Sequence, residues 1–361
     1  MPQLVVATVA VEVPMGAQVY QEEVASRAAR ALDDGSAAAT GATGGWSVDR
    51  AVFRSLRSPL AGTHRLPLGR LGSASPAVRR AVGRAVYPRG AVVHRVGLDL
   101  PPHPTRDVVA VQDVVSWRYD DESAPVRAAA EEVRRAAAVV CVSEFSADEA
   151  ADVLGLAERP SVAYNGVDPV YFSAEPLPRE RLAALGVDGP YVLHAGGASR
   201  RKNLEELAVA WTAVRSARPD LTLVMSGPPH PRRTALFADL PGTRLVGRLP
   251  GELMPGLVAG AAAVVVPSRY EGFGLPALEA MAAGVPVVAA RTSSLPEVVG
   301  DGGVLAEPDG ASLAEALLWV TTRDAEVEAL VGRGRGRAAT FTWERSAAQH
   351  AAIWRAVAAR G

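Results

Sequence analysis

Two residue types are almost absent from this chain of 361 residues, which contains one cysteine, Cys141, and one lysine, Lys202. A single cysteine excludes a disulfide within the chain. Its position in the apolar run 136–142 predicts a buried core thiol, because free cysteine is among the most buried residue types. Codon bias in a GC-rich genome explains why almost all basic side chains are arginines, but it does not explain the one lysine.

Strong net charge and long apolar runs are absent too. The formal net charge of −1 argues against general binding of nucleic acid, which needs a strongly basic face. No stretch reaches the roughly 20 apolar residues of a membrane span. The stretch 1–12 lacks a positively charged leader and predicts a first β-strand, not a signal peptide. We therefore expect a cytoplasmic protein that does not bind nucleic acid.

Apolar strand-like runs alternate with alanine-rich helical stretches along the whole chain, which predicts parallel α/β sheets. The length suits two domains of ordinary size. Turn and proline signals between two such series place the boundary after residue 172, which gives domains 1–172 and 173–344. The first series covers 4–11, 19–32, 108–111, 126–135, 139–142 and 147–154, and the second covers 191–194, 204–215, 221–225, 253–259, 264–266, 277–283 and 285–289.

Two carboxylates, Glu271 and Glu279, stand eight positions apart around a glycine turn in the segment 264–288. The order there is strand, turn, helix, with Pro276 suited to the first position of the helix and Gly284 to its end. A helix start offers unpaired N–H groups to a phosphate, and the carboxylates accept hydrogen bonds from hydroxyls. The segment fits a diphosphate attached to polyols. The alternative is an ordinary turn with two solvated glutamates.

A cationic loop follows the strand 191–194, where Arg201 and Lys202 stand directly before a helix. An arginine fork and a lysine point charge hold a diphosphate and neutralise a departing nucleotide. We expect this loop to act together with the segment around Glu271.

The segment Glu271-Gly-Phe-Gly-Leu-Pro-Ala-Leu-Glu279 resembles the E-x7-E signature of retaining glycosyltransferases of family 4, and Arg201-Lys202-Asn203 matches the R-K-N pattern of that family. The resemblance implies the GT-B fold: α/β, with two Rossmann-like domains whose parallel sheets face an interdomain cleft, and a C-terminal helix, 345–361, that returns to the first domain. It implies that Glu271 contacts the transferred sugar and Glu279 the nucleotide ribose.

The resemblance also assigns further donor-binding residues. They are Gly16 in the first loop, Gly196 and Asn203 beside Arg201 and Lys202, Val246, Gly247 and Arg248 at the base, and the backbone of Gly272, Phe273, Gly274 and Leu275 at the sugar and diphosphate. Some relatives carry another arginine beside the glycine of the loop that contains Arg201 and Lys202. Gly196 and Gly197 fill that space here, so the sequence assigns no third cation.

Gln112-Asp113 departs from the family, because many relatives have His-Asp at this strand end. A glutamine hydrogen-bonds a sugar hydroxyl but takes up no proton near neutral pH. If the departing phosphate accepts the proton of the acceptor, no protein base is required, and we interpret Gln112 as altered specificity or rate. A dead enzyme is the alternative. Asp113 orients donor or acceptor, or is structural. The predicted catalytic residues are therefore Glu271, Arg201, Lys202, Gln112 and Asp113.

An arginine-rich stretch lies between residues 50 and 100. A predicted helix, 76–86, directs Ala77, Val78, Ala81, Val82 and Ala85 inward and Arg79, Arg80 and Arg84 outward. Such a helix suits peripheral contact with an anionic membrane at its inner face, and a solvated arginine-rich surface is the alternative. The arginines are Arg50, Arg54, Arg57, Arg65, Arg70, Arg79, Arg80, Arg84, Arg89 and Arg95, against the one carboxylate Asp99.

The sequence thus predicts a metal-independent, cofactor-free, retaining transferase. It moves a hexose from a nucleotide diphosphate sugar, with a slight lean to GDP-mannose, to a hydroxyl of a glycan, a lipid-linked sugar or a small molecule. The alternatives are a nucleotide-sugar-binding protein impaired in catalysis, a GT-B nucleotide-sugar epimerase, and a phosphorylase, for whose pyridoxal phosphate Lys202 is the sole candidate.

Overall fold

The computed structural model describes residues 1–12, 16–33 and 45–360, and the chain divides into two compact units. The first unit is Met1–Gly166 together with the chain from Trp343 onward, and the second is Val167–Thr342. The units meet in the chain at residues 166 and 167, whereas the sequence places the boundary at 172 and 173.

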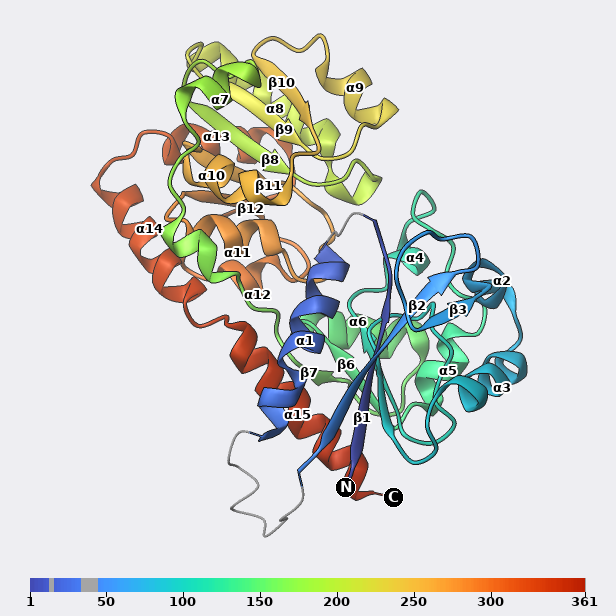
Figure 1. Ribbon diagram of the computed structural model, residues 1–361. Coiled ribbons are helices and arrows are strands. Elements are labelled where there is room, and N and C mark those ends of the chain that lie inside the picture. Colours follow the sequence, from blue (N-terminus) through green and yellow to red (C-terminus); the bar gives the residue numbers. More distant parts are fainter. Residues whose placement is uncertain (13–15, 34–44, 361) are drawn as a thin grey trace. The chain divides into compact units, whose positions relative to one another are not determined.

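The first unit contains a seven-stranded parallel sheet in the order β3-β2-β1-β4-β5-β6-β7 (Figure 1). Its core includes Phe53, Val93 and Leu100. The strands are β1 (Gln3–Val9), β2 (Ser47–Ser55), β3 (His64–Leu66), β4 (Val92–Arg95), β5 (Asp107–Val111), β6 (Ala138–Cys141) and β7 (Ser161–Val162). The helices are α1 (Gly16–Asp33), α2 (Leu68–Ser73), α3 (Pro76–Val86), α4 (Val115–Arg118), α5 (Ala129–Arg135), α6 (Glu144–Leu154) and α15 (Trp343–Ala359).

Helix α15 lies beside α1 (Figure 1). A directional chain of side-chain hydrogen bonds connects it to α1 and β4. The indole N–H of Trp354 donates to Nδ1 of His94 at 3.0 Å, so the proton of His94 lies on Nε2, 3.4 Å from the Tyr20 hydroxyl. That hydroxyl lies 2.8 Å from Nε2 of His350, whose Nδ1 donates to the carbonyl of Ser346. Burial lowers the pKa of both imidazoles, that of His350 to about 4, so both rings are neutral near pH 7.

The expected orientation of helix 76–86 is wrong for Arg79, which is fully buried, and for Val78, which is 51% exposed. Arg84 is exposed, as expected. Gly83, one turn after Arg79, touches the backbone so closely that a Cβ there would lie 1.9 Å from the carbonyl oxygen of Pro102. Helix α3 therefore packs through its Arg79–Gly83 face and exposes Ala77, Val78, Ala81 and Ala85.

Helix α3 packs in this way because of a buried ionic network formed by Arg79, Arg95, Glu132 and Asp107. This network is called the Arg79–Arg95 cluster below. Arg79 binds Glu132 with Nε–Oε1 at 2.6 Å, and Arg95 binds Asp107 with Nη2–Oδ2 at 2.7 Å. Arg95 also reaches Glu132 at 3.4 Å. Both guanidinium groups donate to the carbonyl of Leu100. Every charge in the network has an opposite partner, which makes burial tolerable.

Other arginines of the 50–100 stretch are also engaged. Arg50 forms an ion pair with Glu22, and Arg80 forms one with Glu131. The stretch is therefore less basic as a surface than its sequence indicates. Among the described residues, no helix is long and apolar enough to span a bilayer.

The second unit contains a six-stranded parallel sheet in the order β10-β9-β8-β11-β12-β13 (Figure 1). The strands are β8 (Tyr191–Ala195), β9 (Thr222–Ser226), β10 (Thr243–Gly247), β11 (Ala263–Val266), β12 (Val287–Ala290) and β13 (Val304–Ala306). The α-helices are α7 (Arg179–Ala184), α8 (Leu204–Ala217), α9 (Pro231–Phe237), α10 (Met254–Ala259), α11 (Leu275–Ala282), α12 (Leu295–Val299), α13 (Gly310–Val320) and α14 (Ala325–Ala338), and the 3-10 helices are η2 (Pro169–Ser173), η3 (Arg200–Lys202) and η4 (Gly251–Leu253).

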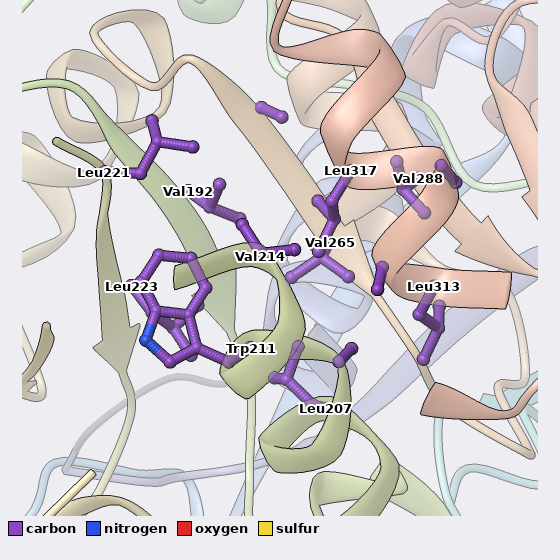
Figure 2. Packing of buried hydrophobic residues seen from close by; sticks show 14 of the residues in the cluster. Val192, Leu207, Trp211, Val214, Leu221, Leu223, Val265, Val288, Leu313 and Leu317 are labelled. Carbon is purple, nitrogen blue, oxygen red and sulfur yellow. The ribbon is translucent and has the colours of Figure 1, made fainter. Parts of the chain in front are cut away.

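The core of the second unit packs α8 and α13 against one face of this sheet (Figure 2). Trp211 from α8 is fully buried and donates its indole N–H to the carbonyl of Pro241 at 3.0 Å. Leu313 and Leu317 from α13 belong to the same core, together with valines of the strands. The predicted fold class, two Rossmann-like units with parallel sheets, is confirmed. The buried position of Cys141 is confirmed as well.

Candidate functional site

Three neighbouring strands, β8, β11 and β12, send their following loops to the same edge of the second sheet. In parallel sheets, ligands bind beyond the carboxyl ends of the strands. The loops are 196–203 after β8, 267–274 after β11 and 291–294 after β12. The sequence motifs around Lys202 and Glu271 therefore meet in space.

Glu271 lies between the two predicted cations. Nζ of Lys202 is 2.6 Å from Oε1 of Glu271, and Nη1 of Arg201 is 3.1 Å from Oε2. Arg201 also donates to the carbonyl of Tyr270, and the Ser268 hydroxyl donates to Oε1 at 2.7 Å. The carboxylate is thus fixed by two charges and a hydroxyl.

The charge state of Glu271 follows from this arrangement. Burial acts against the charged form, but the positive charges of Lys202 and Arg201 and the hydrogen bonds from Lys202 and Ser268 outweigh it and lower the pKa of Glu271 to about 2. The side chain is therefore a carboxylate throughout the neutral range.

Two serines of the loop after β12 hold the backbone around Glu271. The Ser293 hydroxyl accepts from the N–H of Glu271 at 3.0 Å. The Ser294 hydroxyl lies 2.9 Å from the carbonyls of both Glu271 and Phe273. Ser293 has a positive φ of 52°, which is uncommon for a residue with a side chain. The loop is therefore held from a third strand, and sequence reasoning did not find these serines.

Asn203 joins the loops after β8 and β11. It has a φ of 55°, and its side-chain amide donates to the carbonyls of Pro267 and Pro308. Its side-chain oxygen accepts from Nε of Arg269 at 2.8 Å, and the N–H of Arg269 donates to the carbonyl of Arg201. The structure thus gives Asn203 a connecting position between the two loops.

The turn and helix after Glu271 form as predicted. Gly274 has a φ of 104°, Pro276 lies in the first turn of α11, and Gly284 follows the helix with a φ of 70°. A Cβ on Gly274 would also lie 2.8 Å from Leu295. Only glycine suits this position.

Glu279 lies on α11, away from the cations, beside Tyr171 and Asp168 of the η2 segment. Its side chain is half-buried and hydrogen-bonds the Tyr171 hydroxyl. Burial raises the pKa of Glu279 to about 7, helped by the charge of Asp168 and opposed by the bond from Tyr171. Unlike Glu271, this carboxyl group changes its charge near neutral pH.

The remaining predicted residues lie on other elements. Gly196 directly follows β8, close to His194, whose Nε2 is buried and has no hydrogen-bond partner among the described residues. The residues predicted at the base, Val246, Gly247 and Arg248, lie at the end of edge strand β10, which β9 separates from β8.

The other predicted residues belong to the first unit. Gly16 is the first residue of α1, and the three residues before it lie outside the described part of the chain. Gln112 follows β5 and accepts from the Ser146 hydroxyl through its carbonyl. Asp113 accepts from the N–H of Val115 at 3.2 Å, and so supports the start of α4.

The two loops that carry Lys202 and Glu271 are strongly cationic. Residues 196–203 and 267–274 contain four basic side chains, Arg200, Arg201, Lys202 and Arg269, and one carboxylate, Glu271. Such an edge attracts anions, and bidentate guanidinium groups suit phosphate oxygens.

Comparison with known proteins agrees with this geometry. Residues 189–323 match the family described as glycosyl transferases group 1. The chain contains a group 1 glycosyltransferase domain. That domain covers the three loops and both glutamates of the predicted signature.

The curated relatives of this glycosyltransferase domain include mannosyltransferases. The chain is 38% identical over 184 residues to the O-antigen chain mannosyltransferase B of Escherichia coli, which is 49% of this chain and 48% of that protein. It is 36% identical over 168 residues to the MMP alpha-(1->4)-mannosyltransferase of Mycolicibacterium hassiacum, covering 44% and 41%. The matches thus span about half the length of these relatives.

The fold has solved counterparts over the full chain. The sucrose-phosphate synthase of Thermosynechococcus elongatus superposes with a TM-score of 0.73 at 23% identity, with complete coverage of both chains. WaaG, a glycosyltransferase involved in lipopolysaccharide biosynthesis, superposes with a TM-score of 0.66 at 19% identity, covering 96% and 99%. At these identities the likeness concerns the fold.

Proposed function

We propose that this protein is a retaining glycosyltransferase that moves a hexose from a nucleotide diphosphate sugar to a hydroxyl group. The observation that carries the proposal is Glu271, held between Lys202 and Arg201 at 2.6 and 3.1 Å on the edge of a parallel sheet. The group 1 domain and the names of its relatives support the reaction class.

The chemistry assigns a task to each group. Lys202 and Arg201 bind the diphosphate and neutralise the charge that grows as the bond between the sugar C1 and the phosphate oxygen breaks. Glu271, ionised near pH 7, orients a hydroxyl of the transferred sugar. The acceptor hydroxyl forms the new bond to C1 on the same face, and its proton passes to the departing phosphate. No protein base is then required at Gln112.

GDP-mannose is the proposed donor, supported by the mannosyltransferase names of relatives that cover about half of their length. The proposed acceptor is a hydroxyl of a glycan, a lipid-linked sugar or a small molecule. Independence of metals and cofactors stays a prediction, as does the cytoplasmic location.

Peripheral contact with an anionic membrane through residues 50–100 also stays a prediction. It now rests on the exposed face of α3, where Val78 and Arg84 are both accessible, and no longer on Arg79. Co-sedimentation with liposomes that contain or lack anionic lipid tests it. Binding that is absent at every salt concentration contradicts it.

A thermal-shift panel with GDP-, UDP-, dTDP- and ADP-sugars tests the donor site. A nucleotide at 100 times its dissociation constant stabilises the folded protein by about 2.7 kcal/mol. We expect the GDP-sugar to give the largest shift, and Lys202→Ala and Glu279→Ala each to reduce it. If none of the four shifts the wild type, the donor site is wrong.

Turnover separates the proposal from its rivals. Consumption of donor in the presence of lipid or cell-wall extract distinguishes a transferase from an impaired binding protein. Interconversion of free nucleotide sugars without an acceptor would favour an epimerase. Cofactor absorbance in the purified protein would favour a phosphorylase.

A further inference from the structure

Two adjacent arginines of α9, Arg232 and Arg233, donate hydrogen bonds to carbonyl groups of the loop after β8. Arg233 donates through Nη2 to the carbonyls of Gly196 and Gly197, to the latter at 2.9 Å. Arg232 donates through Nη1 to the carbonyl of Ala198 at 3.0 Å. Three consecutive carbonyls of the loop thus point toward α9.

The opposite side of this loop is fixed by the same contacts. In a trans peptide the C=O and the following N–H point in opposite directions. Holding these carbonyls turns the N–H groups of Gly197, Ala198 and Ser199 away from α9. In the described part of the chain, none of these three N–H groups donates a hydrogen bond. Successive backbone N–H groups of this kind suit an anion.

The packing leaves no freedom around Arg233, whose side chain is buried. The guanidinium also donates to the carbonyl of Pro228 at 2.8 Å. Gly227 has a φ of 145°, and a Cβ there would lie 2.1 Å from the carbonyl oxygen of Gly196 and 2.8 Å from Nη2 of Arg233. Only glycine lets the two loops and the guanidinium approach so closely.

A contribution to stability does not explain why a buried arginine stands at position 233. Its hydrogen-bond partners are neutral carbonyls, its buried Nε has no partner in the part of the chain that the structure describes, and burial lowers its pKa. A guanidinium in such surroundings costs stability compared with an apolar side chain. The loop that it shapes accounts better for its position.

We infer that Arg232 and Arg233 are positioning residues, which set the amide groups of residues 197–199 directly ahead of Arg201 and Lys202 for the diphosphate of the donor. This inference rests on the proposed function. Arg233, on α9, also places a cation beside Gly196 and Gly197, where the sequence assigns none. The arginine acts through the backbone of the loop and not by contact with the ligand.

The test uses the full chain and the nucleoside diphosphates GDP, UDP, dTDP and ADP, with affinities from calorimetry. For the diphosphate that the wild type binds best, we expect Arg233→Gln to raise the Kd about tenfold or more, because small misplacements of a binding group are expensive. Arg233→Lys retains one donor group and should restore part of the affinity. In steady-state kinetics the KM for the donor should rise more than kcat falls.

Arg215 offers a matched control in the same unit. It also donates to backbone carbonyls, those of Pro219 and Leu221, and packs against a glycine of positive φ, Gly242. We expect Arg215→Gln to lower the melting temperature while changing the Kd less than about twofold. Equal Kd values for Arg233→Gln and Arg215→Gln would overturn the inference.

If Arg233→Gln does not fold, Arg232→Gln provides the second variant, with a smaller expected rise in Kd because one carbonyl is released. An unchanged Kd in that variant would then overturn the inference. If the wild type binds none of the four diphosphates, the proposed function fails and this inference fails with it. If the wild type binds and the variants bind equally well, only this inference fails.

Discussion

Each unit holds a cluster of buried or half-buried charges, and the two clusters are built differently. In the Arg79–Arg95 cluster of the first unit, two arginines face two carboxylates, and all four side chains are 4% exposed or less. In the second unit, Arg201 and Lys202 share the single carboxylate of Glu271, and their side chains are 18% and 10% exposed.

The difference separates a closed structural cluster from the cluster to which we assign the proposed function. Balanced charges that also bind backbone carbonyls form a closed network, and such a network fixes the packing of α3. Two cations on one carboxylate, at the accessible edge of a sheet, suit a further anion. Burial of charge alone would not distinguish the two, whereas the balance of charge and the exposure do.

Removal of a carboxylate from the closed network should have the largest effect on stability. Glu132→Gln leaves Arg79 and Arg95 with one charged partner fewer inside the first unit. We expect the free energy of unfolding to fall by about 3–5 kcal/mol in denaturant titrations. The neighbouring Glu131→Gln breaks exposed pairs with Arg80 and Arg135 and should cost about 0–1 kcal/mol. Equal losses in the two variants would contradict the comparison.

The equivalent change in the second cluster should affect activity instead. Glu271→Gln retains the shape of the side chain but removes the charge to which we assign the orientation of the sugar. We expect turnover to fall about 100- to 1000-fold, whereas nucleotide affinity is kept, because Lys202 and Arg201 remain. Glu307→Gln, which breaks an exposed pair with Arg291, is the control and should leave turnover unchanged. Full turnover in Glu271→Gln would remove its assigned role.

A smaller effect is expected at Glu279, whose pKa of about 7 lies above its ordinary value of 4.5 because of burial. Between these values the folded state binds more protons than the unfolded state, so stability falls as the pH rises from about 4.5 to 7. Glu279→Gln removes this dependence. We expect the variant to gain about 2 kcal/mol on the wild type across that range in denaturant titrations.

Tyr171→Phe sharpens the prediction for Glu279. The Tyr171 hydroxyl hydrogen-bonds the ionised carboxylate and lowers its pKa, so loss of the hydroxyl should extend the pH dependence to higher pH. A pH profile that is the same in wild type and Glu279→Gln would show that the carboxyl group titrates normally.

The smallest effect should come from an arginine outside both clusters. Arg84 is exposed on α3, and Arg84→Gln should change the free energy of unfolding by less than about 0.5 kcal/mol and leave nucleotide affinity unchanged. A larger change in either measurement would mean that charge matters on this surface, and the distinction between clusters and scattered arginines would weaken.

Much of the fold and part of the site could be predicted from the sequence, because local patterns carry them. The alternation of apolar runs predicts the sheets, and Gly274 and Pro276 predict the turn and the start of α11. What failed depends on residues far apart in the chain. Helix α3 buries Arg79 instead of Val78 because Arg79 pairs with Glu132, 53 positions away.

The residues that hold the loops of the candidate site could not be predicted for the same reason. Ser293 and Ser294 reach the Glu271 loop only because β12 lies beside β11, and Arg233 reaches Gly196 only because β9 lies beside β8. No local sequence motif specifies the order of the strands in the sheet. A serine or an arginine in a loop gives no sequence signal of what it will hold.

The single lysine gives the protein one ε-amino group, and this group lies in the ion pair with Glu271. A lysine-specific protease therefore has one target bond, between Lys202 and Asn203, and cutting it separates residues 1–202 from 203–361. Because Lys202 and Asn203 are both buried, the bond is cut only after this part of the chain unfolds, locally or together with the whole unit. The rate at which the two fragments appear thus measures that unfolding, and a nucleotide bound at the proposed site should slow it.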